Sequence, residues 1–315
     1  MLNIILLPLL SLFLSDFFMI WLILEISNFF FICSMNFSML HKKMIFFYFM
    51  IQVMASFTIM MTLMFNSLLF KNNFTLIILI LALMLKLSIP PMHLWLPLIM
   101  KFLPWKIMFI LLTFQKIIPF YLLSLLYLPP LFIFSSILLC SILPPYNMLN
   151  LTNFKLLLAY SSINQSSWMI LLISMKNIIW FKYFLFYSFI SLSIFSLFHL
   201  SKMFMSSNYF PSQFKFNTLF TILMMNMSGL PPFSFFYMKW YSLFIFLKSS
   251  NLLIILMIMM ISSLLMLYIY VNMSINFFFL MKFKSKLINL NFSYTLTILF
   301  LTYLTLFFSS ILFIF

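Results

Sequence analysis

Glycine and acidic residues are almost absent from this sequence. One glycine, Gly229, occurs in 315 residues, and only Asp16 and Glu25 carry carboxylate side chains. A single glycine excludes the G-x-G-x-x-G loop with which dinucleotide-binding domains hold a pyrophosphate. The two cysteines, Cys33 and Cys140, are too few and too far apart in the sequence to hold zinc, haem or an iron–sulfur cluster. We therefore expect the chain to carry no redox cofactor of its own.

Charged side chains are scarce as a class. They make up 6% of the chain, against about 25% in ordinary globular proteins. Hydrophobic residues make up 66%, and the mean hydropathy is +1.23. Apolar runs close to the roughly 20 residues that cross a bilayer follow one another along the chain, without the period-two alternation of a β-barrel. The composition predicts an all-α polytopic membrane protein that forms one helical bundle over residues 1–315.

About eleven segments have the length and apolarity of membrane helices, and turn-forming residues such as Pro-Pro at 129–130 and 144–145 end several of them. The sequence predicts these helices at residues 2–14, 17–38, 44–69, 74–100, 105–127, 129–144, 154–175, 178–202, 216–247, 251–275 and 290–314.

All basic residues are lysines, and their distribution predicts the orientation of the chain. Ten lysines fall in loops on one side of the predicted membrane, including the loop at 276–289, and four fall on the other side. The positive-inside rule places the ten-lysine side and the N-terminus inside, and Phe315 outside. The charge of +15 is spread between apolar runs rather than gathered on one face. This argues against a nucleic-acid partner and leaves membrane lipids, cardiolipin among them, as partners.

Residues with GC-rich codons are the depleted ones: alanine occurs three times, valine twice and glycine once. This bias is typical of an AT-rich gene, as in insect-like mitochondrial genomes, with an AT-rich bacterium or endosymbiont as the alternative. No cleavable targeting segment precedes the first apolar run. We therefore expect a mitochondrial inner-membrane protein with its N-terminus in the matrix and its C-terminus in the intermembrane space.

Four ionisable side chains fall inside predicted membrane helices: Glu25, Lys86, Lys116 and Lys239. Each costs at least about 2.5–3.5 kcal/mol at mid-membrane depth, so function or pairing must compensate. A lysine near a helix end can instead extend to the interface, whereas a glutamate is too short to do so. We expect Glu25 to pair with Lys86. Burial favours the neutral form of a lysine and a nearby carboxylate the charged form, which is the physical basis of a proton relay.

Helix breakers lie beside two of these lysines. Pro90 and Pro91 follow Lys86 closely, and Gly229 precedes the second proline pair, Pro231 and Pro232. Prolines leave carbonyl groups of the preceding turn without a helical partner, and glycine adopts positive φ without strain. The sequence predicts discontinuous helices near 89–91 and 229–232, as at the ion sites of inverted-repeat transporters. A helix end at the membrane surface is the alternative at either position.

Two further polar features lie within apolar segments. His93 follows the first break, where a relay and a plain buried histidine are both open interpretations. The run AYSSINQSSWM at 159–169 is unusually polar for a membrane helix. It suits either a water chain or helix packing through small hydroxyl side chains.

The sequence resembles the antiporter-like subunit 2 family of mitochondrial NADH–ubiquinone oxidoreductase, respiratory complex I. The matching motifs run in the family's order and cover most of residues 20–240. They are WLILEIS at 21–27, YFMIQVMAS at 48–56, LKLSIPPMHLWLP at 85–97, LLTFQKIIP at 111–119, KLLLAYSSINQSSWM at 155–169 and MSGLPPFSFFYMKW at 227–240.

The resemblance implies a proton-translocating subunit with eleven helices and inverted repeats. It implies that Glu25 faces Lys86, that Lys116 is a central lysine, and that Lys239 is a distal one. NADH, FMN, iron–sulfur clusters and ubiquinone would bind elsewhere in the complex, and neighbouring antiporter-like subunits would be partners. Gln165 stands where the family usually has a histidine, which removes a titrating group there. A stand-alone cation/proton antiporter and a non-conducting structural spacer remain alternative functions.

Overall fold

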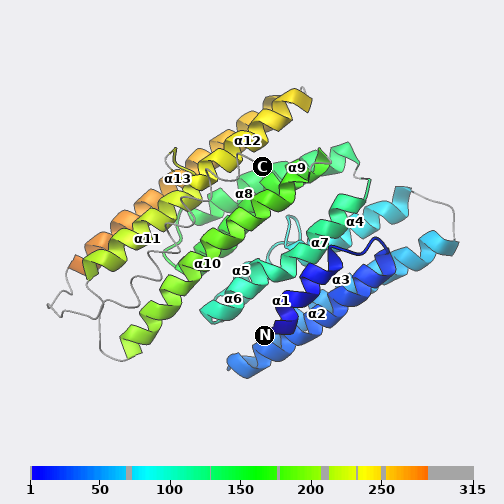
Figure 1. Cartoon of the computed structure of the whole chain (residues 1–315), viewed down its shortest axis with the longest axis horizontal. Coiled ribbons are helices and arrows are strands. Elements are labelled where there is room, and N and C mark those ends of the chain that lie inside the picture. The colour runs from blue at the N-terminus through cyan, green and yellow to red at the C-terminus, as the bar shows by residue number, and fades with distance from the viewer. Residues whose placement is uncertain are drawn as a thin grey trace. The chain divides into compact units, whose positions relative to one another are not determined.

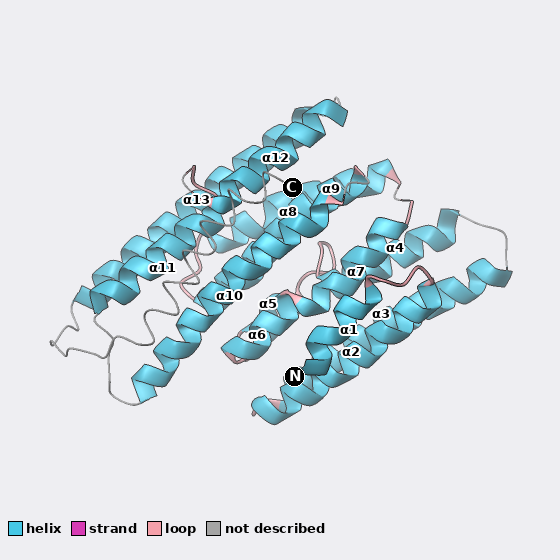
Figure 2. Cartoon of the chain, in the orientation of Figure 1, coloured by secondary structure: helices cyan, strands magenta, loops and turns pink. Residues whose placement is uncertain are grey.

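The computed structural model describes residues 2–68, 73–127, 129–175, 178–206, 213–231, 233–249 and 253–282. These residues form helices joined by loops, and no strand occurs among them (Figures 1 and 2). The all-helical prediction is confirmed. The chain divides into two compact units, residues 1–140 with 153–167 and residues 141–152 with 168–315. The single bundle over 1–315 stays a prediction.

The first unit contains the helices of the N-terminal part of the chain, α1 to α7. They are α1 (Leu2–Ser11), α2 (Phe17–Ser38), α3 (Lys42–Leu68), α4 (Asn73–Leu87), α5 (Trp95–Met100), α6 (Trp105–Leu112) and α7 (Phe114–Leu125). Helix α7 contacts α1, α2, α4 and α6, and α3 contacts α2 and α4. The unit boundary passes through α8 (Pro130–Met148) and α9 (Phe154–Ser174). Helix α7 is therefore in contact with both helices that carry the predicted ion pair.

The second unit is built around α11 (Gln213–Ser228). This helix contacts α10 (Ile179–Ser206), α12 (Ser234–Ser249) and α13 (Leu253–Lys282), and α10 also contacts α12. Helices α11 and α12 are the two halves of one predicted segment, separated at Gly229. At the interruption, Gly229 and Leu230 are partly buried and Pro231 is exposed.

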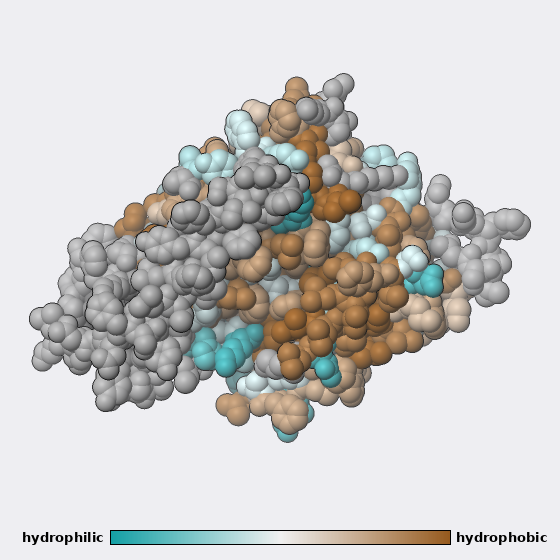
Figure 3. Space-filling view, in the orientation of Figure 1, coloured by the Kyte–Doolittle hydropathy of each residue, from teal (hydrophilic) through white to brown (hydrophobic). Residues whose placement is uncertain are grey.

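Among the described residues, seven helical segments are long and apolar enough to cross a membrane, with α6 and α7 counted together. The apolar parts of α1, α4 and α11 are shorter than a full span. In the α9 span 89% of the residues are buried, whereas in the α2 span only 28% are. Apolar side chains dominate the described surface in Figure 3, as expected for helices that face lipid. Helix α9 is thus an interior helix despite its polar sequence.

Most predicted segments correspond to helices, and two predicted helix ends are wrong. Helix α8 continues through Pro144 and Pro145 to Met148, since helices in membrane proteins accommodate proline where neighbouring groups satisfy the freed carbonyls. Helix α13 continues to Lys282, because residues 276–282 contain no glycine or proline to stop it. The predicted helix at 290–314 lies outside the described residues.

Both predicted breaks are present and end in the same local geometry. Helix α4 ends with Ser88 at φ 58°, and α11 ends with Gly229 at φ 80°. At the first break, Ser88 N donates to Leu85 O at 3.2 Å and Ile89 N to Met84 O at 2.9 Å. These two bonds define a Schellman cap.

The second break repeats this cap. Gly229 N donates to Asn226 O at 3.0 Å, and Leu230 N donates to Met225 O at 3.5 Å. In each case an apolar residue and then a proline follow the left-handed residue. The two breaks therefore share one capping geometry and one order of residue types after the left-handed residue. Pro232 lies outside the described residues.

Ser88 occupies a left-handed position that favours glycine, and this leads to a stability prediction. We expect Ser88→Gly to be more stable than Ser88→Ala by about 1 kcal/mol, because a Cβ in this conformation costs about 1–2 kcal/mol. Both variants lose the hydroxyl that donates to Leu87 O, so the comparison isolates the backbone. Thermal unfolding of the two purified variants measures the difference. Equal stabilities would contradict the left-handed geometry.

Candidate functional site

The predicted pair of Glu25 and Lys86 is present in the first unit. Lys86 Nζ on α4 donates to Glu25 Oε1 on α2 at 3.0 Å. The Lys86 side chain is 2% exposed and that of Glu25 is 31% exposed. Lys86 is the last residue but one of α4, where the negative end of the helix dipole also favours a cation. Two features of the fold thus stabilise a charged Lys86.

A residue that follows the first break is hydrogen-bonded to the last turn of α4. Trp95 Nε1, at the start of α5, donates to Leu85 O at 3.0 Å. His93 lies in this turn and is buried, and neither of its ring nitrogens has a hydrogen-bond partner among the residues that the structure describes. A relay through His93 stays a prediction.

Lys116 has different surroundings. It is 5% exposed, lies in the first turn of α7, and donates through Nζ to Ser162 Oγ on α9 at 3.3 Å. No described carboxylate lies within ion-pair distance of it. The first turn is the positive end of the helix dipole, which destabilises an ammonium group. A proton on Lys116 is therefore less well compensated than one on Lys86.

Helix α7 begins where the sequence predicted an uninterrupted span. Thr113 separates α6 from α7 with φ −113° and ψ −83°, and both its N and its Oγ1 donate to Phe109 O, at 3.0 Å and 2.7 Å. A threonine hydroxyl that bonds the carbonyl four residues back competes with regular helix geometry. Thr113 is the only serine or threonine in residues 105–123, and this feature of the sequence could have indicated the interruption.

Lys239 is buried in the second unit beside the second break. It is 7% exposed, and its Nζ donates to Ser228 O at 2.9 Å and lies 5.3 Å from the ring centroid of Phe235. Ser228 O belongs to the last turn of α11, where the helix dipole is negative. A carbonyl dipole and an aromatic face therefore take the place of a carboxylate partner.

Gly229 leaves the space in which the Lys239 side chain lies. A Cβ built on Gly229 would stand 3.2 Å from both Cδ and Nζ of Lys239. Asn226 joins the two half-helices, since its Oδ1 accepts from Ser234 Oγ at 3.3 Å and from Phe235 N at 3.4 Å. The chain's one glycine thus combines a left-handed backbone with close contact to a buried lysine.

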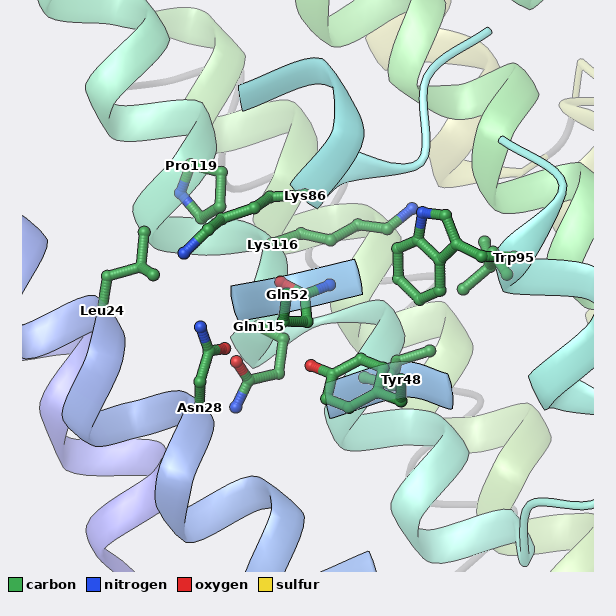
Figure 4. A pocket seen from close by; sticks show the side chains of 11 residues that line it. Leu24, Asn28, Tyr48, Gln52, Lys86, Trp95, Gln115, Lys116 and Pro119 are labelled. Carbon is green, nitrogen blue, oxygen red and sulfur yellow. The ribbon is translucent and has the colours of Figure 1, made fainter. Parts of the chain in front are cut away.

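A small cavity lies between α2, α3, α4, α5, α6 and α7 in the first unit (Figure 4). Its volume is about 10 Å³, and both Lys86 and Lys116 line it. In Figure 4 the amine ends of these two lysines point in opposite directions, in keeping with their partners on α2 and α9. The other lining residues are Leu24, Asn28, Tyr48, Gln52, Trp95, Leu96, Leu111, Gln115 and Pro119.

The polar run on α9 is buried almost throughout. Ser162 and Ser166 are one turn apart; Ser162 accepts from Lys116, and Ser166 Oγ donates to Cys140 Sγ at 3.8 Å. Asn164 is 1% exposed, and its amide atoms have no hydrogen-bond partner in the described part of the chain. Packing alone leaves such a group unsatisfied, which favours the water-chain interpretation of this run.

The structure brings Lys86 and Lys116 together around one cavity, with Glu25 paired to Lys86, and it brings Gly229 and Lys239 together in the second unit. Sequence reasoning did not find Asn28, which lines the cavity, or the Ser228 carbonyl, which accepts from Lys239. Asn28 lies three residues after Glu25, and therefore on the same face of α2, which was a usable signal.

The chain is similar to known membrane proteins in sequence and in fold. The family model described as NADH:quinone oxidoreductase/Mrp antiporter, transmembrane, matches residues 36–266. NADH-ubiquinone oxidoreductase chain 2 of Anopheles gambiae is 33% identical over 242 residues, which is 70% of this chain and 68% of the relative. The same-named protein of Aedes aegypti is 36% identical over 170 residues, which is 50% of this chain and 47% of the relative.

Solved structures show the same fold at low identity. A chain of respiratory complex I from Thermus thermophilus has a TM-score of 0.73 and 17% identity, covering 92% of this chain and 72% of that one. A chain of the Mrp complex from a Dietzia species has a TM-score of 0.71 and 13% identity, covering 82% of this chain and 56% of that one. The breaks and the buried lysines thus lie in a fold found in two kinds of membrane complex.

Proposed function

Because the chain belongs to the NADH:quinone oxidoreductase/Mrp antiporter family of membrane proteins, we propose that it is an antiporter-like subunit of respiratory complex I. In this function it moves protons across the inner mitochondrial membrane while other subunits transfer electrons from NADH to ubiquinone. The observation that carries the proposal is the set of three buried lysines with three different kinds of partner: a carboxylate, a hydroxyl and a carbonyl dipole.

These partners give the lysines unequal tendencies to hold a proton. Two unit charges 4 Å apart interact by about 4 kcal/mol at an effective dielectric constant of about 20. Moving Glu25 away from Lys86 would therefore remove a large part of what holds the proton there. We propose that the proton then passes to Lys116, and that a charge change at Lys116 acts in turn on Lys239. Broken backbone beside Lys86 and Lys239 supplies polar groups inside the membrane for these transfers.

The redox cofactors of such a complex would lie in other subunits. Among the described residues no group of three histidine, cysteine or acidic side chains is arranged to hold a metal. With one glycine in the sequence, a dinucleotide loop has no residues to form it. We expect this chain to move charge and to carry out no redox chemistry. Its expected partners are neighbouring antiporter-like subunits and anionic lipids such as cardiolipin.

Copurification tests the assignment to complex I against a stand-alone antiporter. The matched family covers both complex I subunits and Mrp antiporters, so the family alone does not separate them. If the proposal holds, solubilised membranes captured through a tag on this chain retain NADH dehydrogenase activity and bound flavin. Capture of the chain by itself, with cation/proton exchange activity in vesicles, would support the stand-alone transporter instead.

The orientation of the chain is a separate prediction. We expect three lysines, Lys282, Lys284 and Lys286, to face the matrix together with the N-terminus. We expect Phe315 to face the intermembrane space. The ten-to-four distribution of loop lysines is the reason. Protease cleavage or amine labelling at these lysines should require access from the matrix face of sealed vesicles. Modification from the outer face would reverse the predicted topology.

A further inference from the structure

One residue of the second unit, Asn226, bonds to both sides of the second break. Its main-chain O accepts from Gly229 N at 3.0 Å, which is part of the cap that ends α11. Its side-chain Oδ1 accepts from Ser234 Oγ at 3.3 Å and from Phe235 N at 3.4 Å. These two donors belong to the first two residues of α12, where N–H groups have no acceptor within the helix itself. The Asn226 side chain therefore caps α12 from the helix that precedes the break.

Burial makes this cap hard to replace. Asn226 and Ser234 are each 1% exposed, and Phe235 is 0% exposed. Bulk water does not reach atoms buried to this extent, so it cannot take over the bond that the Phe235 N–H makes with Asn226. A buried N–H that loses its acceptor destabilises the fold more than an exposed one, because no water compensates it. Without the Asn226 amide oxygen, the first turn of α12 would have to move or unwind to find another partner.

The first turn of α12 sets the position of Lys239. The Phe235 ring lies 5.3 Å from Lys239 Nζ, and its centroid lies 5.1 Å from that of the Tyr183 ring on α10. Lys239 follows Phe235 by one turn on α12 and reaches back to α11, where its Nζ donates to Ser228 O at 2.9 Å. The lysine thus connects the same two half-helices that Asn226 joins. Its amine stays at Ser228 O only if α12 begins at a fixed place relative to α11.

The first break is bridged at the corresponding residue by different chemistry. Leu85 stands three residues before the left-handed Ser88, and Asn226 stands in the same place relative to Gly229. Leu85 O accepts from Nε1 of Trp95, the first residue of α5, at 3.0 Å. A side-chain donor on a main-chain oxygen at one break thus corresponds to a main-chain donor on a side-chain oxygen at the other. The recurrence favours a common role, which is to hold two half-helices together beside a buried lysine.

We propose that Asn226 is a positioning residue for Lys239: its amide oxygen holds the start of α12 so that the Lys239 amine stays at Ser228 O. Asn226 itself exchanges no proton. The cap is a property of the fold and does not depend on how the chain functions. Its effect on proton transfer rests on the proposed function, in which Lys239 carries a proton.

Asn226→Leu tests the cap, because leucine has a similar shape and no acceptor. Met224→Leu is the matched control, since it changes another fully buried residue of α11 at nearly constant volume. In high-resolution density of the intact membrane complex, we expect Lys239 Nζ about 2.7–3.2 Å from Ser228 O in the unsubstituted protein and in Met224→Leu. In Asn226→Leu this distance should exceed about 3.5 Å, which is beyond hydrogen-bond range. An unchanged distance in Asn226→Leu would overturn the proposal.

Asn226→Asp shows whether the acceptor is what matters. Aspartate keeps an oxygen at the same place, and it caps helices about as well as asparagine does. We therefore expect Asn226→Asp to assemble and to keep the first turn of α12 where it lies in the unsubstituted protein. If Asn226→Leu does not assemble, assembly of Asn226→Asp supports the cap, and failure of both variants overturns it.

Protons pumped per electron, measured on assembled complexes, test the effect on transport. A residue that only stabilises the bundle changes the yield of complex and leaves this ratio unchanged. Asn226→Leu should lower the ratio, though by less than Lys239→Met does, because the lysine is displaced and not lost. Met224→Leu should keep the full ratio. A full ratio in Asn226→Leu, with Lys239 displaced, would overturn the positioning role. A full ratio in Lys239→Met would instead contradict the proposed function, which the density at Asn226 does not measure.

Discussion

Glu25→Gln is expected to destabilise the first unit and to stop proton translocation. The substitution leaves Lys86, whose side chain is 2% exposed, without its carboxylate. Removing one partner of a fully buried pair costs about 3–5 kcal/mol. Because Glu25 itself is 31% exposed and partly screened, we expect about 1–3 kcal/mol here. Thermal unfolding of the purified complex and pumping in vesicles measure the two effects.

The double variant Glu25→Gln/Lys86→Met separates stability from transport. It removes both charges, so no buried ion lacks a partner, and most of the lost stability should return. Translocation should stay absent, because no titratable group remains at this position. Recovery of both properties would mean that the pair serves only to pack α2 against α4, and that protons use another route.

Gly229→Val is expected to disrupt the second break and with it the position of Lys239. A β-branched side chain at φ 80° is strongly disfavoured, since even a single Cβ in the left-handed region costs about 1–2 kcal/mol. The new Cβ would also stand 3.2 Å from Nζ and Cδ of Lys239. We expect lost assembly or, in complexes that do assemble, lost pumping.

Gly229→Ala provides the graded comparison for this position. It introduces the Cβ without branching, so Lys239 need shift by only a few tenths of an ångström, and an intermediate loss of pumping is expected. Assembly is followed by native electrophoresis and pumping by a pH-sensitive dye. Wild-type pumping in the valine variant would show that the glycine is incidental, for example a consequence of codon bias.

The breaks could be predicted from the sequence because proline and glycine act locally. Pro90 cannot donate to the carbonyl of Lys86, and Gly229 adopts positive φ without cost, so both interruptions follow from residue chemistry. The same reasoning failed at Pro144 and Pro145, where α8 continues to Met148. A proline pair ends a helix only if no neighbouring group satisfies the freed carbonyls, and sequence alone does not identify those neighbours.

The Glu25–Lys86 pair could also be predicted, since the chain has only one carboxylate inside an apolar span. The partners of Lys116 and Lys239 could not. Ser162 is one of many hydroxyls in the run at 159–169, and Ser228 O is a main-chain atom that every residue possesses. Which of them reaches a lysine depends on how α7 faces α9 and on the turn at Gly229. These are properties of the tertiary structure.

The number of protons pumped per electron in Lys86→Met and Lys239→Met tests the central claim most directly. Methionine keeps the length and apolar character of the side chain and removes the charge, so each variant should assemble in the membrane. If these lysines belong to a proton path, both variants have a lower proton-to-electron ratio and slower NADH oxidation, because electron transfer is coupled to transport. Normal assembly with the full ratio in both variants would contradict the account, and the chain would then be a structural spacer.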